Sequence, residues 1–140
     1  MNILNATDVR KNWSVTLDTV IHEKPVYVKR TRDNLAILNT DTLYEVLSGY
    51  KYAFHKYFED DNSVTLSTET LDLVVNAQNE EQAKTELAAE IKEYAEDFYD
   101  HYATWSAAPN RKAHIPLVLK ALLLDESSIR EELECQGGKN

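Results

Sequence analysis

The spacing of hydrophobic residues at the start of the chain predicts two short helices after a short strand at residues 2–4. Val9 and Trp13 lie one helical turn apart, and both are expected to face inward, so that Arg10 projects from the opposite side. Asn5 is a suitable N-cap for this first helix. A second helix, capped by Ser14, follows from an apolar stripe at helical spacing, formed by Leu17, Val20 and Ile21.

A β-hairpin is predicted next. Pro25 ends the second helix, because the residue before a proline avoids helical backbone. Two apolar runs, residues 26–30 and 35–38, flank the polar turn at residues 31–34. A further helix, capped by Asn39 or Thr40, is expected from apolar residues that recur at three- and four-residue steps: Leu43, Val46, Leu47, Tyr50, Phe54, Tyr57 and Phe58.

The second half of the chain also has the pattern of a folded segment. Residues 63–67 and 71–76 are strand-like, and residues 68–70 form a turn between them. Asn79 is then expected to cap a long helix with acidic residues in its first turn. The apolar stripe of this helix steps by three or four residues and is predicted to be core: Ala83, Leu87, Ile91, Tyr94, Phe98, Tyr102 and Trp105.

Pro109 ends the long helix, and a second apolar helix is expected over residues 115–123, with Pro116 tolerated in its first turn. Residues 125–134 have the pattern of a short amphipathic end. The fold class predicted is therefore α+β, with a first module at residues 1–58, an acidic and mostly helical domain at 62–135, and a mobile tail at 136–140. Residues 59–62 are the expected boundary between the two parts.

Charge distinguishes the two halves. The net charge of the chain is −9. Residues 1–56 contain eight Lys and Arg against six Asp and Glu, a net charge of +2, whereas residues 57–140 contain seven against eighteen, a net charge of −11. Such asymmetry is typical of a protein in which one half meets an anion and the other half does something else.

Several classes of function find little support in the sequence. No apolar run approaches the roughly 20 residues that span a bilayer, and the N-terminus lacks the pattern of a signal peptide, so a cytoplasmic protein is expected. Cys135 cannot form a disulfide within the chain, and the four histidines are scattered. Asp97 and His101 are one helical pair with ligand chemistry, which is poor support for a metal site. We therefore expect no enzyme, no metal and no cofactor.

Four sequence stretches in order carry a family resemblance: DVRKNW on the first helix, KPVYVKR and LAIL on the hairpin, and LYEVL on the following helix. Over about residues 1–56 the chain resembles the Phd/YefM antitoxin family. The resemblance implies a dimeric repressor whose N-terminal half forms the homodimer and reads operator DNA, and whose C-terminal segment neutralises a partner toxin. It also implies that Arg10 and Arg30 contact DNA. The chain departs from the family in having a folded second half in place of a short extended tail.

Two sets of candidate binding residues follow. The first set would contact phosphates and base edges of operator DNA, although its members could also be solvated charges or ion-pair partners of the acidic half. The second set, on the long helix, would face a basic, RNA-binding toxin, although a solvated helix face is the simpler interpretation. A regulator or adaptor without a toxin is the alternative function, and an enzyme with an unrecognised site is a third. The DNA-binding set is Arg10, Lys11, Lys29, Arg30 and Arg32; the partner-binding set is Glu86, Glu90, Glu93, Asp97 and Asp100.

Overall fold

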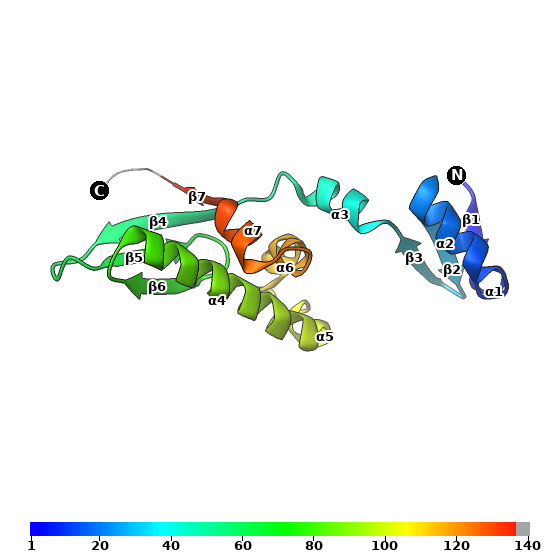
Figure 1. The fold of residues 1–140 in the computed structure, drawn as a ribbon. Coiled ribbons are helices and arrows are strands. Elements are labelled where there is room, and N and C mark those ends of the chain that lie inside the picture. Colours follow the sequence, from blue (N-terminus) through cyan, green and yellow to red (C-terminus); the bar gives the residue numbers. More distant parts are fainter. Residues whose placement is uncertain (137–140) are drawn as a thin grey trace. The chain divides into compact units, whose positions relative to one another are not determined.

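The computed structural model describes residues 1–136, and these residues divide into two compact units, Met1–Val46 and the part that begins at Leu47. Each unit has a buried cluster of its own. The fold is α+β, with one small sheet in each unit (Figure 1). Residues 59–62, the expected boundary, instead form a turn inside the second unit.

The first unit packs two helices on a three-stranded sheet. Its elements in order are β1 (Ile3–Asn5), α1 (Ala6–Lys11), α2 (Trp13–His22), β2 (Val26–Arg30), β3 (Asp33–Ile37) and α3 (Thr40–Leu47), which reaches the boundary between the units. Strand β1 pairs in parallel with β2, and β2 pairs with β3 in the predicted hairpin. The buried cluster is small and contains Val9, Val20, Val26 and Val28.

The start of the chain confirms the first predicted cap and corrects two other expectations. The Asn5 side chain accepts a hydrogen bond from the Thr7 amide at 2.7 Å. Helix α2 begins at Trp13 after Asn12, whose main-chain carbonyl accepts from the Thr16 amide, so Ser14 lies inside the helix and does not cap it. Trp13 is 49% exposed and does not share the inward face of Val9. The break at Asn12 explains this, because it removes the continuous helix that would have placed the two residues on one side.

The second unit begins with a strand where a helix was expected. Residues 52–58 form β4 (Tyr52–Phe58), in which Tyr52 and Phe54 are buried. The prediction that the preceding helix reaches Phe58 was wrong, because these aromatic residues also alternate at the two-residue step of a strand. Helix α3 ends at Leu47, shortly before Gly49.

A four-stranded sheet in the order β6-β5-β4-β7 forms one layer of the second unit. Strands β5 (Val64–Thr68) and β6 (Val74–Ala77) continue antiparallel from β4, and β7 (Leu133–Cys135) returns at the end of the described chain to pair with β4 in parallel. Helix α4 (Glu80–Asp100) packs on β5 and β6 (Figure 1). Strand β7 was not predicted.

Helix α4 confirms the long helix that the sequence predicts, together with its core stripe. Asn79 caps it through a hydrogen bond from the Gln82 amide at 2.8 Å. The helix breaks at His101, and the four-residue α5 (Tyr102–Trp105) follows. Ala83, Leu87, Ile91 and Phe98 are buried, and Tyr94, Tyr102 and Trp105 pack against the same cluster.

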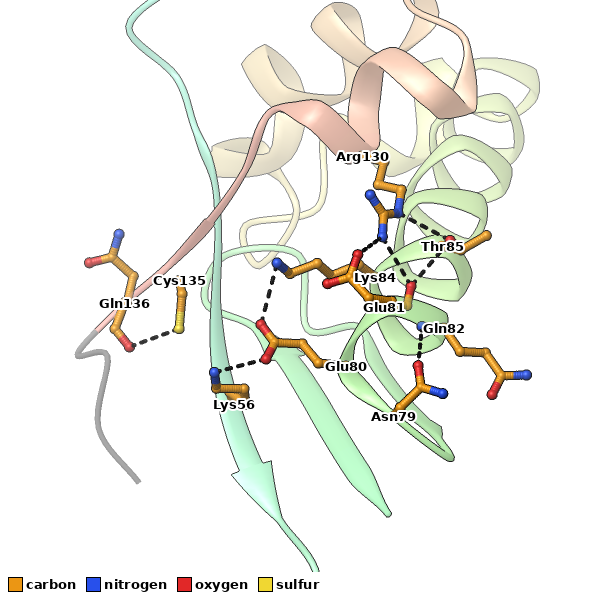
Figure 2. A network of polar contacts seen from close by, with 10 residues as sticks. All are labelled: Lys56, Asn79, Glu80, Glu81, Gln82, Lys84, Thr85, Arg130, Cys135 and Gln136. Atoms are coloured by element: carbon orange, nitrogen blue, oxygen red, sulfur yellow. Dashed lines mark hydrogen bonds and ion pairs between the residues drawn. The ribbon is translucent and has the colours of Figure 1, made fainter. Parts of the chain in front are cut away.

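The chain returns across α4 through a 3-10 turn η1 (Lys112–His114), helix α6 (Ile115–Leu122) with Pro116 in its first turn, and helix α7 (Glu126–Glu131). Arg130 on α7 pairs with the Glu81 carboxylate at 2.6 Å and donates to the Thr85 hydroxyl at 3.1 Å, which fixes α7 to the first turns of α4 (Figure 2). Of the expected mobile tail, Gln136 donates its amide to the Phe54 carbonyl at 2.8 Å; residues 137–140 lie outside the described part of the chain. Among the described residues, no helix is long and apolar enough to cross a bilayer.

Candidate functional site

Three of the five basic candidates line one surface hollow in the first unit. Arg10 comes from α1, and Lys29 and Arg30 come from the end of β2. The hollow measures about 500 Å³, and its remaining lining residues are Asn5, Ala6, Thr7 and Thr31. We call this feature the cationic hollow.

Local structure explains why these three side chains meet. Val9 is buried against the sheet, so the next residue, Arg10, is turned to solvent. Strand β1 leads directly into α1 at Asn5 and pairs in parallel with β2, with Asn5 opposite Lys29. The parallel pairing therefore brings the start of α1 beside the end of β2. Thr31 then takes a positive φ of 57°, which turns the chain into β3.

The charge in the hollow is available to a ligand. Arg10, Lys29 and Arg30 are exposed, and none forms an ion pair with a carboxylate among residues 1–46. Guanidinium groups bind phosphate and the guanine edge in a bidentate geometry, and an ammonium binds phosphate as a point charge. The hollow thus has the chemistry of an anion site that could follow a nucleic-acid backbone.

Lys11 and Arg32 do not line the hollow, although both are exposed in the first unit. The structural boundary also changes the charge balance that the sequence indicated. Residues 1–46 contain six Lys and Arg against six Asp and Glu, a net charge of zero. The surface is therefore basic because of the local arrangement of its charged residues, and not because of the net charge of the unit.

The acidic candidates lie on the solvent side of α4. All five are exposed, and none forms an ion pair with a described residue of its unit. By contrast, Glu80 in the first turn of α4 forms ion pairs with Lys56 at 3.0 Å and with Lys84 at 3.3 Å (Figure 2). The hydrogen bond from Lys56 lowers the pKa of the Glu80 carboxyl below its ordinary value.

Two further exposed residues of α4 were missed at the sequence level, Glu96 and Tyr99, the latter 63% exposed. The sequence signal that could have identified them is the apolar stripe, because residues of α4 that lie outside the stripe are expected to be exposed. We call the set Glu86, Glu90, Glu93, Glu96, Asp97 and Asp100 the acidic face.

The histidines do not form a metal site. No group of three metal-ligating side chains occurs among the described residues. The His101 ring contacts the main-chain carbonyl of Asp97 at 2.9 Å, not its carboxylate, and stacks on Trp105. Cys135 is exposed on β7.

Comparison with known proteins defines the class of this chain. The model of the PHD-like family, described as the antitoxin of a RelE/RelB toxin–antitoxin system, matches residues 1–134. The chain belongs to this antitoxin family. The match includes the second unit, which the sequence resemblance over residues 1–56 did not reach.

A solved structure supports the same assignment. The chain is similar to an antitoxin part of a putative toxin/antitoxin system from Syntrophomonas wolfei subsp. wolfei, with 32% sequence identity and a TM-score of 0.92. The similarity covers 97% of this chain and 99% of the other. No protein with curated function matches the chain.

Proposed function

We propose that this antitoxin is a transcriptional autoregulator, which binds operator DNA as a homodimer through its first unit and neutralises a toxin through its second unit. The observation that carries the DNA-binding part is the cationic hollow, in which Arg10, Lys29 and Arg30 converge without carboxylate partners in their unit. In this proposal Arg10, on a helix, would reach a groove, and Lys29 and Arg30 would contact phosphates beside it. Lys11 and Arg32 would contribute at the margin.

The size of the first-unit core supports the homodimer. A core of four valines with a few partly buried neighbours is small for an independently stable domain of 46 residues. The same unit exposes apolar side chains that a second copy could cover: Ile3, Trp13, Val15, Ile21, Tyr27 and Leu35.

One face of the small sheet illustrates this. Ile3, Tyr27 and Ala36 are paired across the three strands, so their side chains form one row on the same face, and all three are exposed. The neighbouring row on that face is Asn5, Lys29 and Asn34. A dimer that covers the apolar row would thus keep Lys29 beside its edge, and two-fold symmetry would present two cationic hollows to a palindromic operator.

The acidic face of α4 supports a basic toxin as the partner of the second unit. Its carboxylates have no ion-pair partner among the described residues of that unit. Opposite charges would speed the encounter and fix the orientation of the two proteins.

Two experiments test the proposal. A gel-shift assay on the DNA upstream of the chain's own gene should show a retarded complex that weakens in Arg10→Ala and Arg30→Ala. The complex should change little in the control Lys24→Ala, which removes an exposed lysine of the same unit outside the candidate set. No shift with the wild-type protein at low salt would refute DNA binding.

Co-expression with the adjacent reading frame tests toxin neutralisation. Growth should be arrested by the neighbour alone and rescued by the antitoxin, and rescue should fail when Glu86, Glu90 and Glu93 are changed to Lys. A harmless neighbour would instead favour the alternative of an adaptor without a toxin.

A further inference from the structure

A buried lysine links three segments that are distant in the sequence. Lys120 on α6 is 1% exposed. Its ammonium donates to the main-chain carbonyl of Tyr50 at 2.7 Å and forms an ion pair with the Glu132 carboxylate. The Tyr52 ring lies close by, with its centroid 5.7 Å from Nζ.

Tyr50 lies in residues 48–51, which join α3 to β4 and which we call the connector. Glu132 immediately precedes β7, so we call residues 132–135 the C-terminal segment. The two are linked at further points: Lys51 pairs with Glu134 at 4.0 Å, and Leu133 lies opposite Tyr52 in the parallel pairing of β4 with β7. The Tyr52 hydroxyl in turn donates to the Leu117 carbonyl on α6 at 2.8 Å.

We propose that Lys120 is a positioning residue that couples the C-terminal segment to the connector. A partner that displaces the C-terminal segment would free the connector, through which the DNA-binding unit is attached. The effect on operator binding rests on the function proposed above, whereas the coupling itself does not.

The coupling follows from the cost of burying a charge. An ammonium in an apolar interior is tolerated when a counter-charge and hydrogen-bond acceptors surround it. Removal of the Glu132 carboxylate, by mutation or by movement of the C-terminal segment, takes this counter-charge away. Turning the ammonium toward water then becomes more favourable, and the hydrogen bond from Lys120 to the Tyr50 carbonyl is lost when it turns.

The connector is sensitive to this loss because the side chains of residues 48–51 are themselves exposed. The Lys51–Glu134 pair is about half exposed on both sides, at 50% and 49%, and such pairs contribute little. The Tyr50 amide donates to the Leu47 carbonyl at 3.0 Å within the same stretch. Lys120 therefore supplies a buried contact between the connector and the helices.

Hydrogen–deuterium exchange of the full-length protein, without DNA or partner, tests the proposal. In Lys120→Met and in Glu132→Gln, peptides covering residues 48–54 should exchange about tenfold faster or more, the loss expected for a hydrogen bond from a charged donor. Peptides from α4 should keep their protection. The control Lys84→Met breaks a surface pair with Glu80 and should leave the connector unchanged.

Unchanged exchange at residues 48–54 in both variants would overturn the proposal. If a single variant also loses protection in α4, the double variant Lys120→Met with Glu132→Gln decides, because it leaves no buried charge at this position. Fast exchange confined to the connector in the double variant supports the coupling, whereas wild-type exchange there overturns it.

Titration with operator DNA tests the regulatory consequence of the coupling and distinguishes its failure from a failure of the proposed function. With DNA that the wild type binds, the variants should bind with altered affinity although Arg10 and the hollow are untouched, and equal affinity would overturn the regulatory consequence. Failure of the wild type itself to bind DNA would count against the proposed function, while the exchange result would still decide the coupling.

Discussion

The Tyr94 hydroxyl lies 2.7 Å from Nδ1 of His114, and this pair joins the middle of α4 to the turn before α6. His114 is 4% exposed. In a neutral imidazole one ring nitrogen donates and the other accepts, so Nδ1 and the Tyr94 hydroxyl can share a hydrogen bond without a charge on the ring. The buried ring therefore joins the turn before α6 to the long helix in its neutral form.

We expect the second unit to lose stability when His114 becomes protonated. Burial lowers the pKa of His114 below its ordinary value of 6.5, against the opposing effects of the Asp72 carboxylate and the Thr70 main chain, and the Arg111 charge lowers it further. A histidine with a depressed pKa in the folded state stabilises the fold fully above about pH 6.5, and this contribution is lost as the pH falls through the lower folded-state value. The melting temperature should therefore fall between pH 7.5 and pH 5.5.

The variant His114→Gln tests the cause of that fall. It removes the titrating ring, so it should be less stable at pH 7.5 but should show a flatter dependence on pH over the same window. His101→Gln, which changes an exposed ring, should keep the wild-type slope. Parallel slopes in all three proteins would show that other groups are responsible.

Arg10→Ala should weaken operator binding and relax its sequence preference. A bidentate contact between arginine and guanine contributes about 1–3 kcal/mol of discrimination, so affinity should fall by roughly 5-fold to 150-fold for the cognate site and less for unrelated DNA. Fluorescence anisotropy at moderate salt measures both. Equal losses on the two DNAs would assign Arg10 to the phosphates instead.

The dependence of binding on salt tests Lys29 and Arg30 as phosphate contacts. If six phosphates are neutralised per dimer, the logarithm of the binding constant should fall against the logarithm of salt with a slope of about −5. Loss of Lys29 should reduce the magnitude of that slope by about 2, since a dimer carries two copies. Lys29→Ala with the slope of the wild type would remove this residue from the interface.

Trp13→Ala should act mainly on the dimer. The sequence predicts a buried tryptophan, whose loss would cost about 3–5 kcal/mol, but the side chain is half exposed within one chain. If a second copy covers it, its truncation should raise the dimer dissociation constant about 30-fold or more, as for a central aromatic anchor. Analytical ultracentrifugation measures this, with Tyr99→Ala as the control on the other unit. An unaltered dimer would place Trp13 outside the interface.

The sequence was informative where local chemistry and periodicity agree. The caps at Asn5 and Asn79, the hairpin and the α4 stripe depend on neighbours within a few residues, and all were predicted. Strand β4 was mistaken for a helix because Phe54 and Phe58 satisfy both the helical and the strand period, and pairing with strands β5 and β7 decides between the two. Strand β7 itself is set by a pairing across about 80 residues, which no local pattern encodes.

For the candidate sites too, local features could be predicted from the sequence and long-range contacts could not. Arg10 and Arg30 could be singled out by resemblance, but their convergence with Lys29 depends on the parallel pairing of β1 with β2. Lys120 could not be recognised at all, since it occupies a polar position in an apolar helix and its partners, Tyr50 and Glu132, are 70 residues before it and 12 after it.

Division of the chain at the structural boundary should give two fragments with different behaviour. The second unit has a large buried cluster that includes Tyr52, Phe54, Leu66 and Phe98, so a fragment that begins at Leu47 should unfold cooperatively as a monomer. The fragment 1–46 has a core of four valines, so its stability should depend on concentration, as expected for a module that folds on pairing with a second copy. Thermal unfolding at several concentrations checks both. A fragment 1–58 should be less stable than either, because it separates β4 from the other strands of its sheet. A stable fragment 1–58 with a concentration-independent melting temperature would contradict this assignment of the two cores.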